Sequence, residues 1–285
     1  MDTVSHSEQP TVGAPQVYDS SQRPPPFVEE WRELYRYRDL VGHWSVRNVT
    51  IRYKRSILGV LWTLIEPMVL MVVLTIVFSN LFKFADIAPF PVYLLSGLLM
   101  WDFFARASLH IIEENTVSQD LAQRIHVPRS AFALAAINSY LFNWALALIP
   151  LAMIMVILRQ PFSPALVSLP FAMALTAVFT LGLSLTVATA AAFFSDIKLA
   201  YQALLAAVLY STPIIYPLEI VPEKYQPLIL LNPLTHLCRL VRDPIFYGTI
   251  APSETWLIGG AISATSLLVG WWVFTHWRDA FDYQG

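Results

Sequence analysis

Two long stretches without a charged residue dominate the pattern of polar and apolar positions along the chain. One covers residues 130–158 and the other covers residues 160–195, with Arg159 between them. A transmembrane helix needs about 20 mainly apolar residues to cross ~30 Å of hydrocarbon. Each stretch is long enough to span a bilayer, and the pattern predicts an all-α integral membrane protein.

Four more segments have the same apolar character over a shorter length. The first follows a basic run and is interrupted only by Glu66, and the others begin after residues 88, 198 and 254. We therefore predict six transmembrane helices. They are expected at residues 56–82, 89–109, 131–158, 166–194, 199–218 and 255–277.

An amphipathic helix is predicted over residues 27–46, before the first span. The apolar stripe comprises Trp31, Leu34, Tyr37, Val41 and Trp44, and the polar stripe comprises Arg32, Arg36, Asp39 and His43. Spacings of three and four place each set on one helix face. Aromatic residues opposite arginines are typical of a helix in the lipid headgroup layer. The alternative is a helix packed on a soluble domain, for which little sequence remains.

Two other segments differ from the spans. Residues 1–26 contain five prolines and several acidic residues but no apolar core, so they are interpreted as a disordered cytoplasmic leader and not as a signal peptide. In residues 219–253, prolines at 222, 227, 233, 244 and 252 leave apolar pieces of ten residues or fewer. Pieces of that length predict short re-entrant or interfacial helices in the outer loop between spans five and six.

The charged residues give an orientation. The chain has 18 Lys and Arg against 20 Asp and Glu, a net charge of -2. With the N-terminus inside, 13 of the 18 basic residues fall on the cytoplasmic side, as the positive-inside rule requires. We expect a multi-pass protein with both termini in the cytoplasm. The near-zero net charge argues against binding to nucleic acid.

Few residues could carry enzymatic chemistry. The six histidines are scattered without a metal-ligand spacing, and neither a GxSxG elbow nor a GxxxxGK[ST] phosphate loop occurs in the sequence. The single Cys238 excludes an intramolecular disulfide and is expected to be a small buried apolar residue. We expect no catalytic residue, cofactor or metal site on this chain. If ATP drives the protein, another chain binds it.

Two carboxylates lie within the predicted spans. Glu66 is either an interfacial carboxylate paired with Lys54, Arg55 or another cation, or a polar group that lines a conduit. Asp102 stands four residues before Arg106, which predicts an ion pair between neighbouring helix turns near the inner membrane edge.

The basic run before the first span comprises Arg47, Arg52, Lys54 and Arg55. Positive-inside topology and anionic headgroups are sufficient to explain these cations, and docking of a lipid pyrophosphate is the alternative. Aromatic residues make up 13% of the chain. Most are expected in interfacial belts, and some could stack on sugar rings along a transport path.

Three separated segments together resemble one family, the membrane subunits of type-2 ABC exporters that move polysaccharides such as O-antigen, capsule, teichoic acid and galactan. The first contains RELYRYRDL and RNVTIRYKRSILGVLWTLIEP, the second FPVYLLSGLLMWDFFARA with IHVPRSAFALA after it, and the third begins FFSDIKLAYQALLAAVLYSTPIIYPLEI. They occur in the family's order and cover most of residues 30–245. Residues 47–285 are accordingly identified as a six-span type-2 ABC transporter domain.

The resemblance implies a homodimeric pore in the bacterial inner membrane, with two copies of a separate ATP-binding subunit that carries ATP and Mg. The cargo would be a polysaccharide linked to a polyprenyl pyrophosphate, moved out of the cytoplasm. Contacts with the ATP-binding subunit would come from Arg32, Arg36, Glu113, Glu114, Asp120 and Arg124. Spans one and five would line the channel, with Trp62, Glu66, Tyr210 and Tyr216 as candidates. The outer gate would include Pro217, Glu219, Pro222, Asn232 and Pro233.

Other functions remain open at this stage. The same fold could export a lipophilic drug or antibiotic, although the third segment matches the polysaccharide branch better. A membrane enzyme acting on polyprenyl lipids would need an acidic cluster, for which Glu66 and Asp102 are the candidates. A purely structural scaffold would not explain the outer segment cut by prolines.

Overall fold

The computed structural model describes residues 26–54, 57–81, 89–117, 128–194 and 196–277, and all regular secondary structure in these ranges is helical. The all-α prediction is confirmed for this part of the chain. Most of the predicted leader lies outside the described residues, as do Arg55, Asp120 and Arg124.

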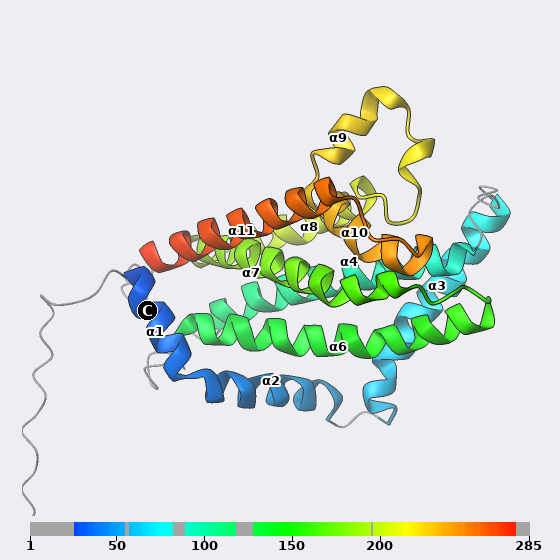
Figure 1. The fold of residues 1–285 in the computed structure, drawn as a ribbon. Helices are drawn as coiled ribbons and strands as arrows, with labels where there is room; N and C mark the ends of the chain where they lie inside the picture. The colour runs from blue at the N-terminus through cyan, green and yellow to red at the C-terminus, as the bar shows by residue number, and fades with distance from the viewer. Residues whose placement is uncertain (1–25, 55–56, 82–88, 118–127, 195, 278–285) are drawn as a thin grey trace, which may run out of the picture.

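Four helices of membrane length form the body of the molecule and run side by side (Figure 1). They are α4 (Phe90–Val117), α6 (Arg129–Ile157), α7 (Leu169–Phe193), which follows the short 3-10 helix η4 (Pro164–Ser168), and α11 (Ser253–His276). They correspond to the predicted spans two, three, four and six. Their length and apolar composition support a multi-pass membrane protein.

The other two predicted spans form shorter helices. The 3-10 turn η2 (Gly59–Leu61) leads into α3 (Trp62–Leu81), and α8 (Asp196–Ser211) ends two residues before Pro213. Proline has no backbone N–H and cannot continue the helical hydrogen-bond ladder. The six-span count therefore stays a prediction, because α8 has 16 residues and, of the described helices, four meet both the length and the apolar composition of a span.

Helices α7 and α11 are in close backbone contact. A Cβ atom on Gly182 of α7 would overlap the backbone of Ser266, and one on Gly270 of α11 would overlap the backbone of Gly182. Two serines of α11 donate hydrogen bonds across the contact, Ser263 to the carbonyl of Leu175 and Ser266 to that of Phe179, both at 2.9 Å. Small residues and hydroxyls allow this approach inside a membrane.

The segment predicted as one helix over residues 27–46 is divided at Tyr37 into α1 (Pro26–Arg36) and α2 (Arg38–Tyr53). Helix α1 lies across one end of the bundle, here called the α1 end, whereas α2 runs along the side of α6 (Figure 1). The buried carboxylate of Glu30 accepts hydrogen bonds from Ser130 Oγ at 2.6 Å and from the Ser130 N–H at 3.4 Å. It thereby caps the first turn of α6.

The expected apolar stripe is only partly buried. Leu34 and Val41 are buried, but Trp31 is 63% exposed and contacts Trp271 of α11 through one ring edge, with centroids 5.9 Å apart. Along α6, the ring of Trp44 stacks on Phe132 at 4.0 Å. The break at Tyr37 turns the two halves of the stripe towards different parts of the bundle.

The segment with many prolines forms short helices at the opposite end of the bundle, here called the far end (Figure 1). They are η5 (Leu218–Ile220), η6 (Glu223–Tyr225), α9 (Gln226–Leu230), α10 (Pro233–Arg242) and η7 (Asp243–Tyr247). Prolines occupy the first turns of α9 and α10, where the missing N–H costs no helical hydrogen bond. Whether these helices enter the membrane stays a prediction.

Candidate functional site

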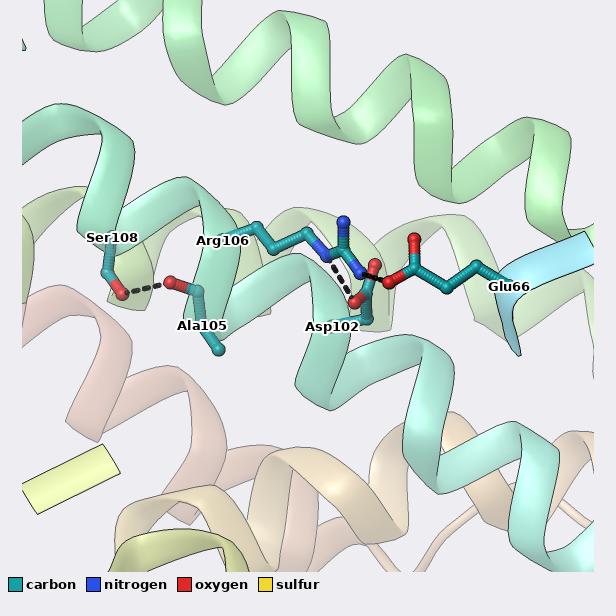
Figure 2. Close-up of polar contacts among 5 residues, drawn as sticks. All are labelled: Glu66, Asp102, Ala105, Arg106 and Ser108. Atoms are coloured by element: carbon teal, nitrogen blue, oxygen red, sulfur yellow. Dashed lines mark hydrogen bonds and ion pairs between the residues drawn. The ribbon is translucent and has the colours of Figure 1, made fainter. Parts of the chain in front are cut away.

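A cluster of three charged side chains joins α3 to α4. Arg106 of α4 donates from Nε to Asp102 Oδ1 on the same helix at 2.5 Å, and from its NH2 group to Glu66 Oε1 on α3 (Figure 2). The predicted pair of Asp102 and Arg106 is confirmed. The partner of Glu66 is Arg106, a residue 40 positions away in the sequence.

The cluster lies near the middle of α4, because this helix continues to Val117, beyond the predicted end of the span. The expected position of Asp102 near the inner membrane edge stays a prediction. Charged groups within a membrane-spanning helix are costly unless they are paired. One guanidinium between two carboxylates meets this requirement with charge-assisted hydrogen bonds.

A cavity of about 240 Å³ opens beside the cluster. Its walls come from the end of α2, from α3, and from the middle of α4 and of α6. The guanidinium of Arg52 lies 4.0 Å from the ring centroid of Tyr140, a cation–π contact. The hydroxyl of Tyr53 lies 2.6 Å from Thr63 Oγ1 and donates to Asn143 Oδ1 at 3.3 Å. These polar contacts hold α2, α3 and α6 together around the cavity.

Two N–H donors in the cavity wall have no hydrogen-bond partner among the described residues. They are Asn143 Nδ2 and Trp144 Nε1, both on buried side chains of α6. Leaving a buried donor unpaired costs free energy. Neither nitrogen is exposed to the cavity, so the polar groups that can reach a guest there are exposed side chains of the wall, such as Arg52 and Glu66.

The structure brings three of the predicted site residues to this cavity, namely Trp62, Glu66 and Arg52. The other described cations of the basic run, Arg47 and Lys54, are exposed and do not line it. Tyr210 and Tyr216 do not line this cavity. Tyr210 lies in the last turn of α8, and Tyr216 follows the end of that helix. There the Tyr216 hydroxyl donates to the carbonyl of Tyr210 at 3.0 Å.

The described residues predicted to contact an ATP-binding subunit lie on α1 and in the last turns of α4. Both segments lie at the α1 end of the bundle (Figure 1). Arg32 and Arg36 are exposed on α1. Glu113, in the last turns of α4, is paired with Lys198 Nζ of α8 at 3.0 Å. Glu114 lies 3.3 Å from His110 Nε2, one helical turn earlier. The ends of α4 and α8 are thus linked on this surface.

The predicted outer-gate residues begin or precede the short helices of the far end. Pro217 and Pro222 immediately precede η5 and η6, and Pro233 begins α10. Asn232 caps α10 by accepting from the N–H of Leu234 at 3.0 Å, and its Nδ2 donates to Thr212 Oγ1 at 2.9 Å. Glu219 is exposed.

Sequence reasoning missed the role of Arg242, which it treated only as one basic residue on the outer side. Its side chain is 4% exposed and reaches from α10 to α4 and to the turn after α8. The available signal was its position directly after Leu240 and Val241 in a mainly apolar helix. Cys238, on the same helix, is buried as expected, and burial raises the pKa of its thiol.

The sequence was compared with known proteins. The family model described as ABC-2 type transporter matches residues 41–246. An O-antigen export system permease protein, RfbA, of Myxococcus xanthus is 28% identical over 88% of this chain and 96% of its own length. A protein of the same name from Klebsiella pneumoniae is 25% identical over 74% of this chain and 82% of its own length. The polysialic acid transport protein KpsM of Escherichia coli is 23% identical over 79% of this chain and 88% of its own length.

The family match covers most of the described bundle, from α2 to η7. It includes the cluster of Glu66, Asp102 and Arg106, the cavity and the buried Arg242. The chain therefore belongs to the ABC-2 type transporter family.

Proposed function

We propose that this chain is the membrane subunit of an ATP-driven exporter that moves a lipid-linked polysaccharide of the O-antigen class across the bacterial inner membrane. The observation that carries the proposal is the likeness to an O-antigen export permease over 88% of this chain. Relatives named for polysialic acid and capsule export support the wider class of cargo, an anionic or neutral polysaccharide.

In this proposal the pore forms between two copies of the chain, with α3 and α8 facing the path. Both helices expose uncharged side chains, such as Val69 and Ile76 on α3 and Leu204 and Tyr210 on α8. A mainly uncharged path would offer weak contacts at many positions, which allow a long polymer to slide.

Energy would come from two separate ATP-binding subunits that carry ATP and Mg. We place their docking surface at the α1 end, where Arg32 and Arg36 are exposed and Lys198 links α8 to Glu113 of α4. A partner that pulls on this surface reaches both helices at once. It works as a motor only if ATP binding favours one of two arrangements of the bundle.

The cavity beside Glu66 would receive the polar end of the lipid carrier. Arg52 is exposed at its wall and forms no ion pair with a carboxylate among the described residues. An exposed guanidinium is well suited to a phosphate group. Arg47, Lys54 and Arg55 would contribute to attraction of anionic lipids nearby.

The proposal is tested by deleting the gene in its native bacterium and measuring polymer on the cell surface and inside the cell. We expect surface polymer to disappear and lipid-linked polymer to accumulate in the cytoplasm, with complementation restoring export. Accumulation distinguishes failed export from failed synthesis. Normal surface polymer combined with new sensitivity to a lipophilic antibiotic would instead support a drug permease. Coexpression with the ATP-binding subunit should yield a complex of two copies of each chain.

A further inference from the structure

The end of α8 is completed by side chains instead of backbone donors. In a continuous helix the N–H of residue 214 would donate to the carbonyl of Tyr210, but the N–H of Ile214 donates to Thr212 at 2.7 Å. The Tyr216 hydroxyl replaces it, donating to the Tyr210 carbonyl at 3.0 Å. The last turn of α8 therefore depends on the position of Tyr216.

Arg242 binds two carbonyls in the turn that follows α8. It donates from one NH group to the carbonyl of Pro213 at 2.6 Å and from the other to the carbonyl of Ile214 at 2.8 Å. A cation at the C-terminal end of a helix also interacts favourably with the helix dipole. Arg242 belongs to α10, so the outer segment holds the end of α8 directly.

Tyr93 of α4 connects the two parts of this arrangement. Its hydroxyl accepts from Arg242 at 2.8 Å and donates to the carbonyl of Tyr216 at 3.0 Å. The guanidinium also lies over the Tyr93 ring, 3.8 Å from its centroid. One tyrosine thus fixes both Arg242 and Tyr216 against α4.

The surroundings restrict Arg242 to this position. Arg242 is 4% exposed and Tyr93 is 2% exposed. A Cβ atom on Gly97 would overlap the guanidinium, so the small residue leaves room for it. Among the described residues no carboxylate forms an ion pair with Arg242, and burial of an unpaired cation is costly. Backbone carbonyls, a hydroxyl and an aromatic face compensate that cost.

We infer that Arg242 and Tyr93 are positioning residues that fix Tyr210 and Tyr216 at the outer end of the transport path. Through them, a movement of α10 relative to α4 changes the position of the last turn of α8. This inference rests on the proposed function for the identity of the path. The contacts themselves do not depend on the nature of the cargo.

The test uses the complete complex with its ATP-binding subunit in lipid nanodiscs. Tyr93→Phe keeps the ring but removes the hydroxyl, and Arg242→Lys keeps the charge but removes the fork of donors. Gly97→Ala disturbs the guanidinium without changing any hydrogen-bonding group. Tyr247→Phe, on a half-exposed ring of η7, is the matched control.

Two quantities are measured for each variant. The first is polymer exported per ATP hydrolysed, which we expect to fall about three- to tenfold in Tyr93→Phe, in line with loss of a buried hydrogen bond. The second is the mobility of a nitroxide label attached to Tyr210→Cys, in a Cys238→Ala background that has no other thiol. Mobility should rise in all three variants and stay unchanged in Tyr247→Phe.

The inference is overturned if the label is as immobile in Tyr93→Phe and Gly97→Ala as in the control. It is also overturned if export and ATP hydrolysis fall in proportion while the label in the assembled complex is unchanged, because that pattern indicates a merely structural role. If Arg242→Lys folds poorly, Tyr93→Phe and Gly97→Ala carry the test. A wild-type complex without export would contradict the proposed function, whereas the label experiment would still report on the positioning contacts.

Discussion

Replacing Arg106 with glutamine removes the cation between Glu66 and Asp102 and leaves two carboxylates close together inside the bundle. Breaking a buried ion pair costs ~3–5 kcal/mol, whereas an exposed pair contributes ~0–1 kcal/mol. The three side chains are 45–56% exposed towards the cavity side. We therefore expect an intermediate loss of about 1–3 kcal/mol in the free energy of unfolding.

Thermal unfolding of the purified protein in nanodiscs, followed by tryptophan fluorescence, measures this loss. For a chain of this size the expected decrease in Tm is ~2–8 °C. The decisive comparison adds Glu66→Gln and Asp102→Asn to Arg106→Gln, which removes the repulsion and leaves amides able to bond with one another. We expect this triple variant to regain most of the lost stability. If it is no more stable than Arg106→Gln alone, electrostatic pairing does not hold α3 against α4.

Three further predictions concern packing and burial. Gly270→Ala should lower the free energy of unfolding by ~1–3 kcal/mol because its Cβ would overlap the backbone of α7. Gly260→Ala is the control, because a Cβ there would have no atom within 4 Å and should leave the stability unchanged. Equal melting curves for the two variants would contradict the close contact. Leu34→Ala should cost ~2–4 kcal/mol at a buried site, whereas Trp31→Ala should change partner binding more than stability in pull-down and melting assays. Cys238 should resist maleimide at pH 8, because burial raises the pKa of its thiol and keeps it protonated where an exposed thiol ionises. Rapid labelling of the folded protein would disprove that burial.

The sequence predicted the helices whose signal is local. Residues 130–158 and 160–195 contain no charge, and they form most of α6, η4 and α7, because a long apolar segment in lipid has to satisfy its backbone within a helix. The Asp102 and Arg106 pair was also predictable from the local sequence, because residues four positions apart lie next to each other on a helix face. Prolines also marked the short helices of the far end.

Contacts between distant segments were beyond such reasoning. The partner of Glu66 depends on how α3 packs against α4, and no spacing in the sequence records that. The break at Tyr37 has neither proline nor glycine to announce it. The role of Arg242 depends on the carbonyls of Pro213 and Ile214 in the turn after α8 and on the space beside Gly97, which only the packed bundle brings together.

The cap that Glu30 provides for α6 has a consequence for the order of assembly. The carboxylate is synthesised 100 residues before Ser130, the residue that it stabilises. This contact can form only after α6 has been synthesised, so the carboxylate of α1 has to stay unpaired with Ser130 until then. A truncation that removes α1 would leave in place the four membrane-length helices found among the described residues and yet expose the first N–H groups of α6. Such a protein should insert normally and then fail late, during packing.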